Sequence, residues 1–580
     1  MKFTRLCLIH AFFVVKTKFL WDNYKARIVG FHIYFKELFK LNINFLRIVW
    51  IMKKRFIFIE SAIILFIFFG CSNPSNTEGG SNITPSNKDV FLIKYNPSYN
   101  FVPHNKTGYV ENNQRAATDS SDSSNSSDFS SSSYIKTPYD KRINPNIDRL
   151  NSEITKTHPL LPKTSANSRN ILASETPTPE QTYTVGTTRN FYYFSSEDKD
   201  DVTPAEFTCK YVGNYCYVWF YNSNNTLTPE SSFTDVNSFD TLGKQFDSIC
   251  EKEQKYFGKH NQDSCYSNII KGKEKIDIIV TDLEGDAKEG QNGGTFGYFN
   301  NADTVTDIEK SNETLAIYLD SYLYLKFPEE CYSTLVHEYN HLLNWINKML
   351  IHEVNNDKQM ETWFTEMLSM VAEDMFQDIL GIEDINSPKS RLYQHLNGSY
   401  IGFKNWADDD SVYYNYANAY AFGAFLARNY GGAELIKKIA TSEYINEEAI
   451  EKATNKSFEE LMRNFAISFL YPSNGEQPYS ANSGIFSLHK GDDQANADGI
   501  KFSPIDVTKL FENGKPKIFY AQKYISKDKP ENTNLELQKY YTVSLDGGGF
   551  SIHYVGKNVT NFKLNVIDMS SDVKYFTYVQ

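Results

Sequence analysis

Residues 328 to 350 carry apolar positions at helical spacing, which predicts a helix with one buried face. The start of this helix is well marked. Pro328 suits the first helical position, and Glu329 and Glu330 place negative charge at the positive end of the helix dipole. The apolar face consists of Leu335, Val336, Leu342, Leu343 and Ile346.

Similar patterns predict the other elements. Helical spacing recurs at residues 235–257, 357–380, 417–430 and 457–470. Short aromatic and β-branched runs predict strands at 191–194, 207–212, 215–221, 275–281 and 315–325. After residue 475 the chain changes character, and strand patterns recur at 517–524, 540–545, 550–555, 562–567 and 573–579. We therefore expect an α+β fold with a mixed sheet, a helical part and a small C-terminal β-sandwich.

The N-terminal part has the composition of an export signal. From Met52, three basic residues precede the apolar run 56–69, which ends at Cys71 in a sequence that resembles a relaxed bacterial lipobox. We expect lipid attachment to Cys71 and cleavage before it; a simple secretory signal or an uncleaved anchor is the alternative. Residues 1–51 match no domain pattern, and we interpret Met52 as the true start. A further membrane-associated segment at 16–50 is the alternative.

Composition sets the remaining boundaries. Ser, Asn, Thr and Asp dominate residues 72–180, which predicts a disordered tether without a core; it could also contain a propeptide. The expected division is an extension at 1–51, a signal peptide at 52–71, a tether at 72–180, catalytic parts at 181–350 and 351–474, and a β domain at 475–580.

The net charge of −12 and the lack of a basic patch argue against nucleic-acid binding.

The helix from residue 328 carries the chemistry. His337, Glu338 and His341 form the pattern H-E-x-x-H. Residues four apart share a helix face, so both imidazoles can bind one metal ion, while the Glu lies beside the open position of that metal. Two surface histidines on an amphipathic helix are the alternative. The pattern predicts a Zn²⁺ site with Glu338 as the general base.

A catalytic zinc needs a third protein ligand, and the helix predicted at 357–380 supplies candidates. Glu361, Glu366 and Glu373 all lie on it. Glu366 and Glu373 are seven residues apart and share a face, so spacing alone does not separate them.

A resemblance to known enzymes separates them. Residues 363–369, W-F-T-E-M-L-S, resemble the W-L-N-E-G-x-S segment of the gluzincin metallopeptidases, and looser matches over about 185–470 resemble the hyicolysin-type bacterial family. The resemblance implies a zincin-like catalytic domain with Glu366 as third zinc ligand. Thr365 and Met367 depart from the pattern. Met370 stands where some gluzincins have an Asp that orients a zinc-bound His, which leaves the partner of His337 open.

The same resemblance offers a stabiliser for the oxyanion. Residues 416–419 resemble the Y-x-x-G stretch of some gluzincins, which implies this role for Tyr416, with Tyr420 and Tyr414 as further candidates. A core or rim tyrosine is the alternative, because the chain has 39 tyrosines.

These patterns predict a zinc metallopeptidase that hydrolyses protein or peptide substrates. We expect a monomer, lipid-anchored in the bacterial cell envelope at the outer membrane or cell surface. The alternatives are a binding lipoprotein with a vestigial or structural zinc site and a zinc hydrolase acting on a non-peptide bond.

Five cysteines besides Cys7 and Cys71 permit disulfides, with Cys209–Cys216 and Cys250–Cys265 as possible pairs. The acidic stretches 408–410 and 492–498 fit solvated loops better than calcium sites.

Overall fold

The computed structural model of the chain describes residues 89–111, 151, 159–162, 181–195, 202–222, 227–287, 294–351, 359–468, 491–492, 494–511, 516–520, 522–523, 539–557, 562–568 and 570–579. The chain divides into two compact units, residues 1–82 and 83–580, and all described residues belong to the second. Cys71 and the predicted segments 1–51 and 52–71 therefore lie outside the described residues. Among the helices that are described, none combines the length and apolarity needed to cross a membrane.

A six-stranded sheet forms the first part of the fold, with the strand order β3-β4-β5-β6-β8-β7. Its three middle strands β5, β6 and β8 run parallel, and β3, β4 and β7 are antiparallel to their neighbours. The parallel strands are buried along their whole length, which explains their continuous apolar sequences. The strands are β3 Thr188–Tyr193, β4 Thr203–Val212, β5 Cys216–Phe220, β6 Ile276–Thr281, β7 Gly297–Tyr298 and β8 Ala316–Asp320.

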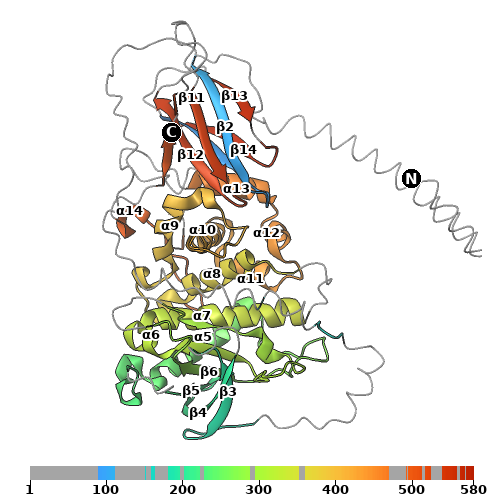
Figure 1. Ribbon diagram of the computed structural model, residues 1–580, viewed down its shortest axis with the longest axis vertical. Helices are drawn as coiled ribbons and strands as arrows, with labels where there is room; N and C mark the ends of the chain where they lie inside the picture. The colour runs from blue at the N-terminus through green and yellow to red at the C-terminus, as the bar shows by residue number, and fades with distance from the viewer. Residues whose placement is uncertain are drawn as a thin grey trace, which may run out of the picture. The chain divides into compact units, whose positions relative to one another are not determined.

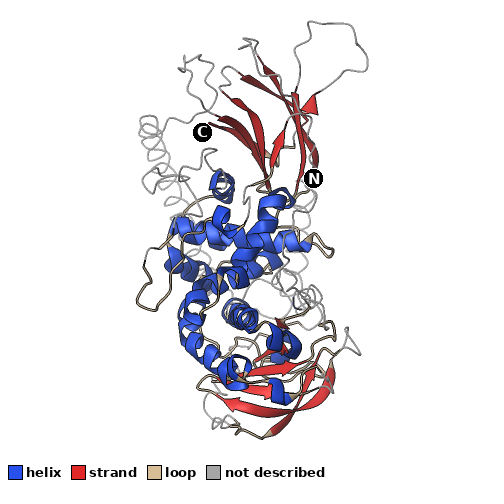
Figure 2. Ribbon diagram, turned by 90° about the vertical axis from the view of Figure 1, so that its left-hand side faces the viewer, coloured by secondary structure: helices blue, strands red, loops and turns tan. Residues whose placement is uncertain are grey.

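Two long helices pack against this sheet and against each other. Helix α5 (Phe239–Phe257) contacts β4 and β5, and helix α7 (Pro328–Asn344) contacts β7 and β8. Helix α7 starts at Pro328, as predicted, but its α-helical part ends at Asn344. A π-helical turn, Trp345–Leu350, continues it. Figure 2 shows the helices between the strands of this sheet and a second group of strands.

One predicted strand is wrong in its second half. The strand expected at 315–325 ends at Asp320, and helix α6 (Ser321–Lys326) follows at once. The Asp320 side chain accepts a hydrogen bond from the Leu323 N–H at 2.8 Å and so caps this helix. The apolar residues after 320 are buried in this helix and would also be buried in a strand. Their pattern alone therefore does not distinguish a short helix from a strand.

Helices form the middle of the structure (Figure 1). They are α8 Thr362–Leu380, α9 Leu392–Gly398, α10 Val412–Tyr430, α11 Gly432–Thr441, α12 Asn446–Thr454, α13 Phe458–Ser468 and the short α14 Val507–Leu510. Helix α8 lies between α7 and α10 and packs extensively on both. A buried ion pair fixes α8 to α10, because the Arg428 guanidinium donates to both carboxylate oxygens of Asp374 at 2.7 and 3.1 Å.

The C-terminal strands form two four-stranded sheets, ordered β14-β1-β12-β9 and β10-β11-β2-β13. Their strands are β1 Asp89–Tyr95, β2 Val102–Glu111, β9 Ile518–Tyr520, β10 Gln522–Lys523, β11 Lys539–Leu545, β12 Phe550–Lys557, β13 Phe562–Asp568 and β14 Lys574–Val579. Each sheet thus takes one interior strand from the segment predicted as a tether. That prediction is wrong for residues 89–111, which pair with strands more than 400 residues later in the chain.

The sheet β14-β1-β12-β9 shares a core with the helices. Phe91 and Ile93 of β1 belong to the same buried cluster as Phe465 of α13 and Phe550 of β12. Hydrogen bonds add to this contact, since the N–H groups of Phe403 and Lys404 both donate to the Gly547 carbonyl at 3.0 Å. Gly402 has a φ of +75°, and a Cβ there would lie 2.3 Å from the Gly547 oxygen, so only glycine permits this approach.

Among the described residues, Cys209, Cys216, Cys250, Cys265 and Cys331 form no disulfide with one another, and four of them are buried. Neither possible disulfide is formed. Cys209 and Cys216 lie on adjacent strands, but Trp219 is the residue opposite Cys209 in the ladder. The Cys250 sulfur lies 3.3 Å from the Tyr339 hydroxyl.

Candidate metal centre

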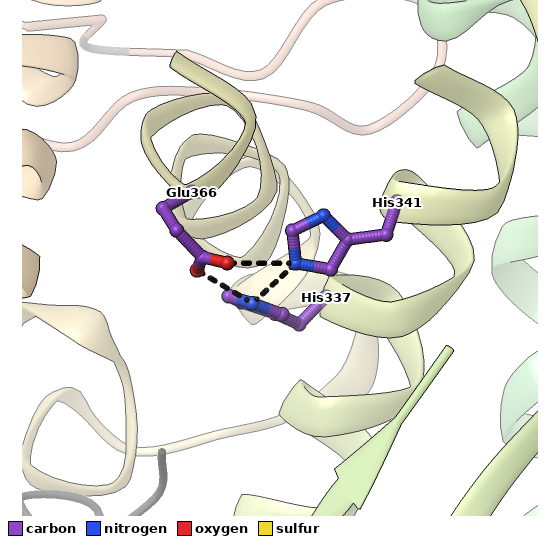
Figure 3. A group of neighbouring side chains, drawn as sticks. All are labelled: His337, His341 and Glu366. Carbon is purple, nitrogen blue, oxygen red and sulfur yellow. Dashed lines mark hydrogen bonds and ion pairs between the residues drawn. The ribbon is translucent and has the colours of Figure 1, made fainter. Parts of the chain in front are cut away.

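The facing sides of α7 and α8 bring together three residues with metal-binding side chains. His337 and His341 extend from α7, and Glu366 extends from α8 toward both (Figure 3). The Nε2 atoms of His337 and His341 are 3.0 Å apart. The two Glu366 oxygens lie 3.1 Å from these nitrogens, Oε2 from His337 and Oε1 from His341.

These distances fit a tetrahedral metal ion. With zinc bonds of about 2.0–2.1 Å, tetrahedral geometry places neighbouring ligand atoms about 3.3 Å apart. The three observed separations are within a few tenths of an ångström of this value. Glu366 Oε2 is buried and, among the described residues, lacks a hydrogen bond of good geometry despite the nearby His337 nitrogen. Two imidazoles and a carboxylate are the donor set of a catalytic zinc site.

The structure places the other two candidate glutamates elsewhere. Glu361 precedes the first turn of α8, and its Oε2 accepts a hydrogen bond from the Trp363 indole at 2.8 Å. Glu373 lies behind His337, where its Oε1 is 2.7 Å from the His337 Nδ1. The Ser333 hydroxyl donates to the other oxygen of Glu373. Of the three, only Glu366 reaches both histidine Nε2 atoms.

Glu373 supplies the partner for His337 that the sequence left open. It is 1% exposed and sits seven residues, two helical turns, after Glu366. The carboxylate accepts a hydrogen bond from the Nδ1–H, and in this tautomer the Nε2 lone pair is free for a metal. The sequence contained a signal for Glu373, because Glu366 and Glu373 share one face of α8. Spacing alone did not show which of the two binds the metal and which one contacts the Nδ1 of His337.

Electrostatics hold the three side chains together. Burial lowers the pKa of His337, but the Glu366 and Glu373 carboxylates outweigh this effect and raise it to about 10. Burial raises the pKa of Glu366, but the charges of His341 and His337 outweigh it and hold that pKa well below its usual range. The carboxylate therefore stays ionised and ready to bind a cation at neutral pH.

Glu338 follows His337 on α7 and is 9% exposed. The H-E-x-x-H pattern expects the general base at this position, directly after the first histidine. Its catalytic role stays a prediction.

Tyr416, the predicted oxyanion stabiliser, lies in the second turn of α10 and is 3% exposed. Its ring packs against the Trp406 ring, with centroids 4.7 Å apart, and the Arg391 guanidinium lies 4.9 Å from its centre. These contacts fit the alternative of a core tyrosine, and the oxyanion role stays a prediction. Tyr420, the next candidate, donates to Asp374 at 3.1 Å.

The edge of the six-stranded sheet runs beside the metal-binding helix. Gly297 of β7 lies so close to Thr334 of α7 that a Cβ would be 2.8 Å from the threonine methyl. Further along, the Trp345 indole donates to the Thr304 hydroxyl at 2.9 Å. Residues 297–304, which comprise β7 and the 3-10 helix Asn301–Thr304, therefore pass along α7 and its π-helical continuation, from one turn before His337 to one turn after His341.

The acidic stretches bind protein groups. Asp409 accepts hydrogen bonds from Ser411, and Asp498 pairs with Lys255 and Tyr256. Asp492 accepts from the Phe502 N–H at 3.0 Å.

We predict that Glu373→Leu weakens zinc binding by about 10- to 100-fold, because His337 loses the group that orients its ring. Glu373→Gln should fall between Glu373→Leu and the wild type, since its amide oxygen still accepts a hydrogen bond. Zinc affinity measured by chelator competition tests this, with the exposed Asp378→Asn as a control on the same helix. Wild-type affinity in Glu373→Leu would refute the positioning role.

A second buried acid lies behind α7. Glu253 of α5 is 0% exposed, and burial raises its pKa well above 4.5, although the Asn340 amide and His337 oppose the shift. The folded chain therefore holds this carboxyl protonated at pH values where the unfolded chain ionises it. Folding therefore binds a proton in this pH range. The contribution of Glu253 to the free energy of unfolding is largest below pH 4.5 and falls as the pH rises toward the pKa in the folded state.

Glu253→Gln cannot ionise, so its stability relative to the wild type should increase as pH rises above about 4.5. The gain is about 1.4 kcal/mol per pH unit until the folded pKa is reached. Melting temperatures of both proteins at pH 5, 6.5 and 8 measure it, with the exposed Glu443→Gln as control. A difference that does not change with pH would contradict the prediction.

Comparison with known proteins supports the same chemistry. The family described as Peptidase M30 matches residues 218–493, a segment that contains both metal-binding helices. The neutral metalloprotease ShpI of Staphylococcus hyicus is 27% identical over 269 residues. That match covers 43% of this chain and 57% of the relative, so it spans little more than half the relative's length. The chain is thus similar to metallopeptidases.

A solved structure also matches in part. An M1 zinc metallopeptidase from Deinococcus radiodurans aligns with a TM-score of 0.27 and 9% identity, over 51% of this chain and 63% of the other. A likeness this weak adds nothing to the argument. The expected resemblance to a metallopeptidase family agrees with the matches, whereas the gluzincin subtype and the zincin-like fold stay predictions.

Proposed function

We propose that this chain is a zinc-dependent metallopeptidase of gluzincin type that hydrolyses peptide bonds in proteins or peptides. The convergence of His337, His341 and Glu366 beside Glu338 carries the proposal, because this donor set with an adjacent carboxylate is what peptide hydrolysis at a metal requires. The similarity to Peptidase M30 and to ShpI supports the same reaction class.

Each residue has a defined task. His337, His341 and Glu366 hold the metal, and Glu373 keeps the Nε2 of His337 directed toward it. Bound zinc supplies a Lewis acid that lowers the pKa of water and polarises the scissile carbonyl. Glu338 takes a proton from the attacking water and delivers it to the leaving amine.

The edge strand β7 offers a place for the substrate backbone. It is the last strand of its sheet, so one side of its main chain faces away from β8. An extended peptide can add to such an edge through main-chain hydrogen bonds. Because residues 297–304 run beside α7, this arrangement brings a peptide bond to His337 and Glu338.

The wider setting is also part of the proposal. Cys71 would carry a lipid that anchors the protein in the bacterial cell envelope, and the body would act as a monomer. Mass spectrometry of the native protein tests the anchor. An acylated peptide that begins at Cys71 supports it, and a peptide from residues 1–51 contradicts it.

The reaction is tested by removing and restoring the metal. The full chain should hydrolyse the oxidised B chain of insulin, lose this activity after treatment with a strong chelator, and regain it with one equivalent of zinc. Product mapping by mass spectrometry identifies the bonds cut. Hydrolysis that survives complete removal of the metal would overturn the proposal.

A further inference from the structure

A side chain from the N-terminal segment binds the residues that directly follow the edge strand β7. The Asn151 amide donates to the Phe299 carbonyl at 2.7 Å, and its oxygen accepts from the Asn301 N–H at 3.0 Å. The Asn301 side chain donates back to the Asn151 carbonyl at 2.9 Å. Asn151 thus takes up one carbonyl and one N–H of the edge that continues from β7.

A second contact lies a few residues later. The Leu161 N–H donates to the Asn268 side chain at 3.0 Å, and the Leu161 carbonyl accepts from the Ser267 N–H at 2.7 Å. Asn268 also donates to the Pro159 carbonyl at 3.2 Å, and Pro162 forms an antiparallel bridge with Tyr266. Leu161 is 51% exposed, whereas Leu160 beside it is half-buried and packs against the main hydrophobic cluster, so both main-chain hydrogen bonds and apolar packing hold this piece.

Both contacts lie on one connected surface. Residues 268 and 270 pair with 304 and 306 through main-chain hydrogen bonds of 2.9 Å. Thr304 also donates to the Asn301 carbonyl at 2.7 Å and accepts from the Trp345 indole. The binding surface of Asn151 and residues 159–162 is therefore attached to α7 one turn beyond His341.

We propose that Asn151 and residues 159–162 form an internal competitor for the substrate. They bind residues 299 and 301, which follow β7, and the adjoining residues 266–268, so they lie where an extended peptide added to β7 would continue. This inference rests on the proposed function, because it assumes that peptides add to the edge beside β7.

The position of this segment in the chain makes the competition effective. It lies between β2, which ends at Glu111, and β3, which begins at Thr188, and both strands are paired within sheets. A segment tied at both ends stays at high local concentration and rebinds readily. The contacts of its described residues are the packing of Leu160 and hydrogen bonds to residues 267, 268, 299 and 301, and a substrate with a longer run of main-chain hydrogen bonds can displace it.

The test measures peptide binding in a background without turnover. In the Glu338→Gln chain, the affinity for fluorescein-labelled oxidised insulin B chain is measured by anisotropy, alone and combined with Asn151→Leu or Leu161→Pro. Asn151→Leu removes the amide at similar volume, and Leu161→Pro removes an N–H. Asn429→Leu is the control, because its amide donates to the Phe425 carbonyl within helix α10.

We expect Asn151→Leu to bind the peptide about tenfold more tightly, since its two side-chain hydrogen bonds no longer compete. Leu161→Pro should show a smaller gain, and Asn429→Leu none. With Glu338 restored, Asn151→Leu should lower KM and leave kcat unchanged.

Two other outcomes separate the claims. Equal affinity in all variants, in a chain that still hydrolyses the peptide, would overturn the competitor and leave the proposed function intact. A chain that neither binds nor hydrolyses the peptide in any variant would overturn the proposed function and this inference with it.

Discussion

Glu366→Ala is expected to lower zinc affinity by about a thousandfold, because the binding free energy of a zinc site is shared among three or four ligands. The carboxylate is the only anionic member of the three-residue group, and it bridges both imidazoles at 3.1 Å. Without it, only the two imidazoles remain, with their Nε2 atoms 3.0 Å apart. These rings are neutral, or repel each other when both are protonated. Peptide hydrolysis should disappear along with the metal.

Zinc content after dialysis and chelator competition measure this effect. Asp378→Ala is the matched control, since it removes an exposed carboxylate from the same helix. Full zinc occupancy and wild-type affinity in Glu366→Ala would show that another group, such as Glu361 or Glu373, is the third ligand.

Deleting residues 1–180 is expected to prevent stable folding. This deletion removes β1 and β2, which are interior strands of both C-terminal sheets. Val90, Phe91, Leu92, Ile93 and Tyr95 are each at most 7% exposed. At about 1.5–3 kcal/mol for each large apolar side chain, their loss costs roughly 10 kcal/mol, which is comparable to the whole stability of a typical domain.

Solubility and melting temperature of residues 181–580 test this expectation against residues 83–580, which keep both strands. The longer chain should melt as a cooperative unit, whereas the shorter one should aggregate or melt at least 15 °C lower, by the usual scaling of melting temperature with stability. Equal melting temperatures would contradict the structural role of β1 and β2.

Local pattern was enough to predict most helices and strands near the metal centre. The start of α7 at Pro328 follows from the proline, the acidic first turn and the apolar face, and all of these are local signals. The pair His337 and His341 follows from helical spacing alone. Glu366 needed a family resemblance, because Glu373 is equally well spaced on the same face.

Long-range pairing was the part that pattern did not reveal. Residues 89–95 have the apolar content of a strand, but they follow a polar stretch, and their partners lie at the other end of the chain. The role of Glu373 depends on the distance between two helices, which the sequence of either helix does not contain. The helix α6 depends on the Asp320 cap, a single side-chain contact in an otherwise strand-like run.

The central claim is that a zinc held by His337, His341 and Glu366 acts with Glu338 on peptide bonds. The most direct test is a paired measurement of zinc content and peptide hydrolysis in the wild type and in Glu338→Gln, which keeps the volume of the side chain but cannot accept a proton. The account predicts one zinc in both proteins and hydrolysis in the wild type alone, with a loss of at least a hundredfold, the scale of general base catalysis. Hydrolysis at the wild-type rate in Glu338→Gln, or a wild type that binds no zinc, would contradict it.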